Sequence, residues 1–218
     1  MRVRLVDVAL SYLPTSASTL GEEDPRWDAL LGGKMGDGRW KYYERGFGTT
    51  CAIVAAGMLE QAGAPPELIN RDAPGGSGFK PGWHVTKLHE GATQLGWIRM
   101  PQEGRLPDLE PGDIYCATHP AKDRDGNPLS GEHVGCLVGV DTTADSIALE
   151  TADGGQGTSA HQMMARIRRV VRVSAGTLTY PDGSRIPSGT ITIQTLGVGN
   201  TRLAWWIQFE DDSSEAEG

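Results

Sequence analysis

Residues 46–63, GFGTTCAIVAAGMLEQAG, constrain the fold of this chain more than any other stretch. Gly46 and Gly48 interrupt regular structure, and the threonines that follow them can cap the first backbone N–H groups of a helix. No charged residue occurs from position 51 to position 59, so this helix has no polar face. A glycine followed closely by two prolines ends it. The sequence therefore predicts a helix that is buried on most sides and carries Cys51 at its N-terminal end.

The position of Cys51 in the first turn of that helix has a chemical consequence. The positive end of the helix macrodipole favours a thiolate over a thiol, and the thiolate is the nucleophilic form. A free cysteine is also among the most buried residue types and commonly packs as a small hydrophobic side chain. Taken alone, Cys51 favours this packing interpretation, so a catalytic hypothesis requires partner residues elsewhere in the chain.

Length and charge limit the classes of protein to consider. The 218 residues suffice for one full core, and we expect a single domain over residues 1–209 followed by an acidic tail at 210–218. Five of the 28 acids lie in that tail, so the body is near neutral although the formal net charge is −8. A nucleic-acid partner normally requires a basic face, and we expect none. We also expect no membrane partner, because no apolar segment is long enough to cross a bilayer.

The first ten residues, MRVRLVDVAL, predict a strand. They have the charged start of a signal peptide, but Asp7 interrupts the apolar run before it reaches the required length. The expectation is therefore a cytoplasmic protein or one exported by a route other than the general secretory pathway.

Nothing in the sequence predicts a cofactor or a metal site. The glycines of residues 32–38 lack the lysine and hydroxyl residue of a phosphate-binding loop. A second helix is predicted over residues 83–97 and carries His84 and His89. These histidines are five residues apart, whereas a pair on one helix face is three or four apart, so they form a poor metal site.

Residues 133–140 and 146–153 are two strand patterns joined by a turn, and they predict a hairpin. A three-residue loop would place His133 opposite Asp153. A four-residue loop would place it opposite Gly154, with Asp153 on the diagonal. Either register leaves a carboxylate near the imidazole.

The remaining predictions concern structure. A helical turn is predicted within residues 22–31, a short helix over 160–169, and further strands at 190–196 and 203–209 that complete a sheet. Cys116 and Cys136 lie on predicted strands that could be neighbours, so the sequence permits a disulfide or two buried free thiols.

Cys51, His133 and Asp153 together form a chemically coherent set. A thiolate attacks a carbonyl carbon, an imidazole transfers a proton to the leaving amine, and a carboxylate holds the ring and its tautomer. Backbone N–H groups at the start of the helix could stabilise the oxyanion. The set therefore predicts nucleophilic catalysis by Cys51.

Four short motifs resemble the papain-like bacterial cysteine peptidases and amidases of the CHAP and NlpC types. They are GTTCA at 48–52 before the apolar helix, PGDI at 111–114, EHVG at 132–135 and ETADG at 150–154. The resemblance covers roughly residues 40–160 and implies an α+β, papain-like fold with a nucleophile helix packed on an antiparallel sheet or half-barrel. Residues 161–209 would then be additional strands.

The same resemblance assigns roles and substrates. It implies Cys51 as nucleophile, His133 as general base and Asp153 as the orienting residue, with Glu150 as a rival for that last role. Members hydrolyse peptide or N-acyl amide bonds, often in peptidoglycan. We therefore expect a peptide or peptidoglycan-like substrate, and an inhibitory partner protein is a further possibility.

The chain departs from the family pattern at two places. Thr50 precedes the cysteine where these families usually carry Asp or Asn, and no upstream glutamine is evident for an oxyanion hole, a role that Tyr42 or Tyr43 could take. Thr50 is likewise a candidate for contact with the substrate or the oxyanion. Two alternatives therefore remain. One is a protein-modifying toxin, a deamidase or acyl transferase that uses the same thioester chemistry. The other is a non-catalytic binding module in which Cys51 only packs.

Overall fold

The computed structural model of the chain describes residues 1–13, 19–21, 24–30, 51–69, 85–122, 128–158, 161–179, 184–195 and 199–209. The helices in these ranges are α1 (Arg2–Tyr12), α2 (Arg26–Leu30), α3 (Cys51–Gln61), α4 (Pro66–Ile69) and α5 (Val85–Gln94). The strands are β1 (Thr19–Gly21), β2 (Ile98–Arg99), β3 (Ile114–Lys122), β4 (Pro128–Thr142), β5 (Ile147–Thr158), β6 (His161–Val173), β7 (Leu178–Thr179), β8 (Arg185–Ile186), β9 (Ile191–Thr195) and β10 (Gly199–Ile207).

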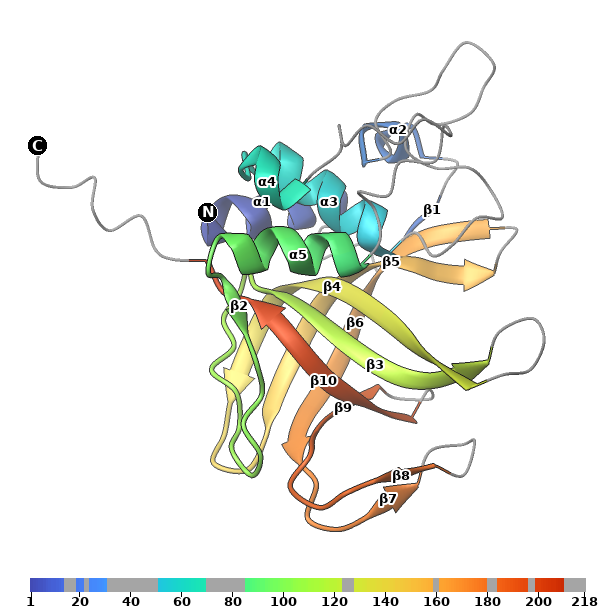
Figure 1. Cartoon of the computed structure of the whole chain (residues 1–218). Helices are drawn as coiled ribbons and strands as arrows, with labels where there is room; N and C mark the ends of the chain where they lie inside the picture. The colour runs from blue at the N-terminus through green and yellow to red at the C-terminus, as the bar shows by residue number, and fades with distance from the viewer. Residues whose placement is uncertain are drawn as a thin grey trace, which may run out of the picture.

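Six antiparallel strands close into a barrel (Figure 1). Each strand pairs with the next in the order β3, β4, β5, β6, β9, β10, and β10 pairs back with β3. The short strands β1 and β2 add to this sheet through β6 and β10. Because the sheet closes on itself, the barrel strands pair on both sides.

The expected fold class is therefore wrong. The protein is mostly sheet with a few short helices, and its closed barrel is not the α+β papain-like fold that the motifs implied. The strands after residue 160 make the difference: β6, β9 and β10 supply half of the barrel. Motifs confined to residues 40–160 could not reveal that the sheet closes.

Two local predictions are also wrong. The N-terminal residues form helix α1, whose buried residues Leu5, Ala9 and Tyr12 follow helical spacing, although its valines suggested a strand. The helix predicted over 160–169 is part of strand β6. The alternating pattern of β6 is hidden because the buried Arg169 faces the barrel interior, where an apolar residue is expected.

Other predicted elements are confirmed. The apolar helix appears as α3 and begins at Cys51, and all of its residues from Cys51 to Leu59 are buried. It ends at Gln61, and Gly63, which follows two residues later and precedes α4, has a positive φ of 80°. The helix predicted over 83–97 is α5, and the two late strands are β9 and β10. The glycine-rich residues 32–38 and His84 lie outside the described residues.

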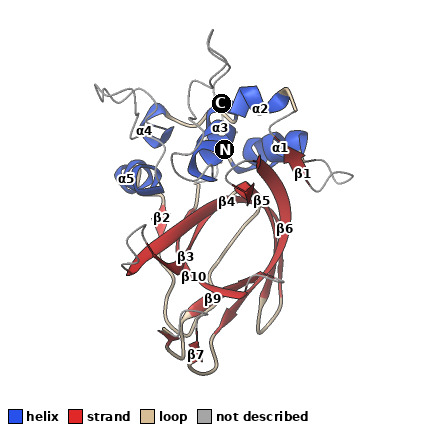
Figure 2. Ribbon diagram, turned by 90° about the vertical axis from the view of Figure 1, so that its right-hand side faces the viewer, coloured by secondary structure: helices blue, strands red, loops and turns tan. Residues whose placement is uncertain are grey.

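The helices gather over one part of the barrel (Figure 2). Helices α1 and α3 pack on β4, and α3 also packs on β5. On α5, the ring of His89 meets Trp205 of β10 edge to face, with centroids 5.1 Å apart. None of the helices in the described ranges is long and apolar enough to span a bilayer.

The buried side chains form two cores, because neighbouring residues of a strand point to opposite faces. The first core lies between the helices and the outer face of the barrel, and it includes Val134, Cys136 and Ala152. The second core fills the barrel, where Tyr115 and Leu137 are fully buried. Strands β4 and β5 therefore hold a helix on one face and the barrel interior on the other.

Gly57 is needed where α3 passes α2. A Cβ atom added at Gly57 would lie 2.5 Å from the carbonyl oxygen of Leu30, which is backbone and cannot rotate away. We expect Gly57→Ala to lower the free energy of unfolding by about 1–3 kcal/mol, because forced repacking outweighs the gain in helix propensity. Urea denaturation provides the measurement.

The matched control is Gly176→Ala, in the turn after β6, where an added Cβ would meet no heavy atom within 4 Å. We expect a change of no more than about 0.5 kcal/mol there. Equal unfolding midpoints for the two variants would contradict the close approach of α2 and α3.

Candidate functional site

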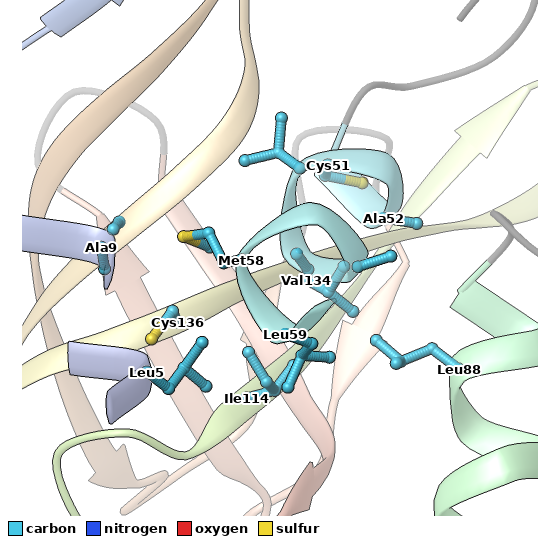
Figure 3. Close-up of a cluster of buried hydrophobic side chains, with 14 of the residues drawn as sticks. Leu5, Ala9, Cys51, Ala52, Met58, Leu59, Leu88, Ile114, Val134 and Cys136 are labelled. Atoms are coloured by element: carbon cyan, nitrogen blue, oxygen red, sulfur yellow. The ribbon is translucent and has the colours of Figure 1, made fainter. Parts of the chain in front are cut away.

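Cys51 begins α3 and belongs to the helix-side core (Figure 3). Its side chain is only 1% exposed, so the sulfur is covered in this conformation. The preceding Thr50, as well as Tyr42 and Tyr43, which were predicted to contribute to an oxyanion hole, lie outside the described residues. The described part of the site therefore consists of Cys51 and the strands below it.

His133 and Asp153 come from the hairpin of β4 and β5, but neither predicted register is correct. Thr142 pairs with Ile147, so the turn occupies residues 143–146, and a bulge at Val138 absorbs one more residue. Continued from Cys136↔Ala152, this register places Gly135 opposite Asp153, with His133 two residues further on the same face. The imidazole reaches the carboxylate on the diagonal: Nε2 of His133 lies 3.5 Å from Oδ1 of Asp153.

Asp153 is fully buried inside the barrel and is held by several donors. Its Oδ1 accepts a hydrogen bond from the hydroxyl of Tyr115 at 3.0 Å. Its Oδ2 accepts one from the hydroxyl of Thr151 at 2.8 Å and one from Nη2 of Arg169 at 2.6 Å. These three partners were not found from the sequence, because their inward orientation depends on barrel closure and strand register.

The electrostatics of this cluster favour an ionised carboxylate. Burial raises the pKa of Asp153, but the charge of Arg169, the close contact with His133 and the hydrogen bond from Arg169 outweigh it and lower the pKa to about 2. Asp153 is therefore a carboxylate at neutral pH, although it has no exposed surface.

The same interactions favour a protonated imidazole. Burial lowers the pKa of His133, but the close contacts and charge interactions with Asp153 and Cys51 raise it to about 9. Nε2 of the imidazole faces Asp153, and the imidazole also interacts with Cys51. The ring of Tyr115 packs beside the imidazole, with centroids 6.2 Å apart. The structure thus brings His133 into contact with both Asp153 and Cys51.

The 3.5 Å separation between His133 and Asp153 is longer than a normal hydrogen bond, and Nε2 is buried. Hydrogen bonds of catalytic groups are often long in unliganded proteins and shorten when a substrate binds. The pair in this conformation is best described as an ion pair in contact.

Two glycines permit the close approach of α3, β4 and β5. A Cβ atom added at Gly135 would lie 1.6 Å from Oδ1 of Asp153. One added at Gly154 would lie 2.5 Å from Cβ of Val54, on the helix that carries Cys51. A bulge follows Asp153 directly, and Gly155 in it has a positive φ of 72°. Bulges at such places re-aim neighbouring side chains.

Glu150, the rival carboxylate, lies elsewhere. Its Oε2 pairs with Nη2 of Arg166 at 2.6 Å, on the face opposite to Thr151 and Asp153. Of the two acids considered, only Asp153 contacts the imidazole.

The other two cysteines are free and buried on the helix side of the sheet. Burial raises the pKa of both thiols, Cys116 and Cys136, so neither is an activated nucleophile. Within the described residues, no group of three or more His, Cys, Asp or Glu side chains could hold a metal ion.

Comparisons with known proteins add no further guide to function. No protein-family model matches the chain, and searches of curated proteins and of solved structures give no match. A functional assignment therefore has to come from the site itself.

Gly135→Ala tests the geometry of the pair directly. The added methyl group would displace the carboxylate of Asp153, and we expect the pKa of His133 to fall from about 9 towards the ordinary value of 6.5. The measurement is an NMR titration of the His133 ring, whose signals are identified by their loss in His133→Gln.

Gly139→Ala, on the same strand, is the matched control. Its added Cβ would meet only the Glu150 side chain, at 3.3 Å, outside the site. We expect an unchanged His133 titration. A normal titration midpoint near 6.5 in the unmodified protein would contradict the pairing of His133 with Asp153.

Proposed function

We propose that this protein is a cysteine-dependent hydrolase of peptide or amide bonds. Cys51 is the nucleophile, His133 is the general acid and base, and Asp153 orients the imidazole. The observation that carries the proposal is the placement of His133 between a buried carboxylate and a thiol at a helix N-terminus, with its pKa raised by both. Perturbed groups with a specific charged partner cluster at catalytic sites.

The arrangement supports a complete reaction cycle. The Cys51 thiolate attacks the carbonyl carbon, and the negative charge moves to the carbonyl oxygen. The imidazolium of His133 gives its proton to the leaving amine as the C–N bond breaks, which leaves a thioester. His133 then removes a proton from water, the resulting hydroxide attacks the thioester, and the thiolate returns with a carboxylic acid as product.

The start of α3 is the candidate site for the oxyanion. Backbone N–H groups in the first turn of a helix point towards its N-terminus, where the macrodipole is positive. When Cys51 attacks a carbonyl carbon, negative charge would develop on the carbonyl oxygen close to these N–H groups.

Access to the thiol is part of the proposal. Because Cys51 is 1% exposed, a substrate reaches the sulfur only when the groups that cover it move. The burial of Cys51 in an apolar cluster also favours a competing account, a non-catalytic module in which the cysteine packs. That account gives no reason for an imidazole that is held protonated between a carboxylate and this thiol.

The motif resemblance suggests which amide bond to test first. Peptidoglycan peptide is the first substrate, with the purified sacculus as the reagent. Release of soluble muropeptides would distinguish cleavage of the wall from modification of proteins.

Cys51→Ala is expected to reduce muropeptide release by at least about 10³-fold, because the covalent step is lost. Cys136→Ala is the matched control, a cysteine of the same helix-side core that no catalytic step uses, and it should keep most of the activity. Thermal unfolding confirms that both variants fold. Equal release by the Cys51→Ala variant and the unmodified protein would contradict the proposal.

The pH dependence of hydrolysis follows from His133. Its pKa is raised to about 9, so the proton needed by the leaving amine is bound at neutral pH and is lost as the pH rises through 9. We expect kcat/KM to fall above this pH. In Asp153→Asn this fall in kcat/KM should occur at lower pH, because the carboxylate no longer stabilises the imidazolium. A fall in kcat/KM at the same pH in Asp153→Asn and in the unmodified protein would contradict the assigned role of Asp153.

A further inference from the structure

We propose that Arg169 is a positioning residue of the site, which acts on His133 through Asp153. Arg169 holds one oxygen of the buried carboxylate and leaves the other for the imidazole. This inference rests on the proposed function, in which Asp153 orients His133, and it adds a residue that no motif of the sequence indicated.

The two carboxylate oxygens have separate partners. Arg169 and Thr151 both bind Oδ2, at 2.6 Å and 2.8 Å. His133 and Tyr115 both face Oδ1, at 3.5 Å and 3.0 Å. The guanidinium therefore fixes the rotation of the carboxyl group, so that Oδ1 points towards the imidazole.

The guanidinium group is itself held by contacts with three other strands of the barrel. Arg169 lies on β6 and is 8% exposed. Its Nη1 donates to the hydroxyl of Thr195 on β9, and its Nε donates to Thr151 on β5 at 3.3 Å. Its charged group also lies 5.5 Å from the centre of the Tyr115 ring on β3. Contacts with three other strands restrict the orientation of the guanidinium group. The guanidinium in turn restricts the orientation of the carboxylate that it binds.

Arginine suits this role for a physical reason. Asp153 has no exposed surface, and a buried carboxylate without a paired cation would take up a proton. A protonated Asp153 would no longer stabilise an imidazolium. The charge of Arg169 keeps Asp153 ionised, and the planar, multi-donor guanidinium orients it as a lysine could not.

The test combines two variants with one matched control. Arg169→Met removes the charge at similar volume, and Arg169→Lys keeps the charge without the planar fork. Arg168→Met is the control, since Arg168 is exposed on the outer face of the same strand, opposite Glu150. Two measurements are made on each variant. An NMR titration gives the midpoint of His133, and steady-state kinetics give kcat and KM for the substrate that the unmodified protein cleaves.

In Arg169→Met we expect the His133 midpoint to fall by about one unit or more, because Asp153 is no longer held ionised and in place. We expect kcat to fall about 100-fold with little change in KM, since Arg169 lies behind Asp153 and away from the substrate. Arg169→Lys should restore part of the midpoint, and Arg168→Met should change neither quantity.

An unchanged His133 midpoint in a folded Arg169→Met variant overturns the inference, even if activity is lost. If that variant does not fold, Thr195→Val decides, because it removes one anchor of Arg169 and keeps the side-chain shape. A smaller fall in the midpoint then supports the inference, and no fall overturns it. A lowered midpoint in Arg169→Met, combined with an unmodified protein that hydrolyses no amide, supports the positioning of His133 and contradicts the proposed function alone.

Discussion

The ion pair between Asp153 and Arg169 inside the barrel is the interaction on which the site depends. A carboxylate in an apolar interior is strongly unfavourable unless a cation and hydrogen-bond donors surround it. Here the donors come from β3, β5 and β6: β5 and β6 are paired neighbours, and β3 lies on the far side of β4, so that the curvature of the sheet turns its Tyr115 towards Asp153. The ionised carboxylate therefore depends on the register and curvature of neighbouring strands of the barrel.

The hairpin of β4 and β5 connects this charged interior to the thiol. Its inward residues include His133 and Asp153, whereas its outward residues Val134 and Ala152 pack in the core below α3. A helix and a buried charge are thus held on opposite faces of the same two strands. The glycines Gly135 and Gly154 leave the space for both contacts. A protonated imidazole results, which lies against the carboxylate through Nε2 and also interacts with Cys51.

Local features of the site could be predicted from the sequence because they are short-range. The apolar run after Cys51 specified a buried helix with the cysteine at its start, and the turn signal at 141–145 brought His133 near Asp153. The register could not be predicted, because the turn occupies residues 143–146 and a one-residue bulge in β4 shifts the pairing again, and neither leaves a mark on the pattern. The closed barrel was missed for a similar reason. The charged Arg169 occupies an inward position of β6, which interrupts the alternating strand pattern, so residues 160–169 were predicted as a helix.

The central claim of the proposal is that Cys51 forms a thiolate–imidazolium ion pair with His133, and the ultraviolet absorbance of the thiolate measures this most directly. The pH titration is recorded as a difference between the unmodified protein and Cys51→Ala, so that only Cys51 contributes. We predict thiolate absorbance that persists well below pH 8.5, the approximate pKa of a free cysteine, and that is lost at neutral pH in His133→Gln. A thiolate that forms only at about pH 8.5 or above, with or without His133, would contradict the account.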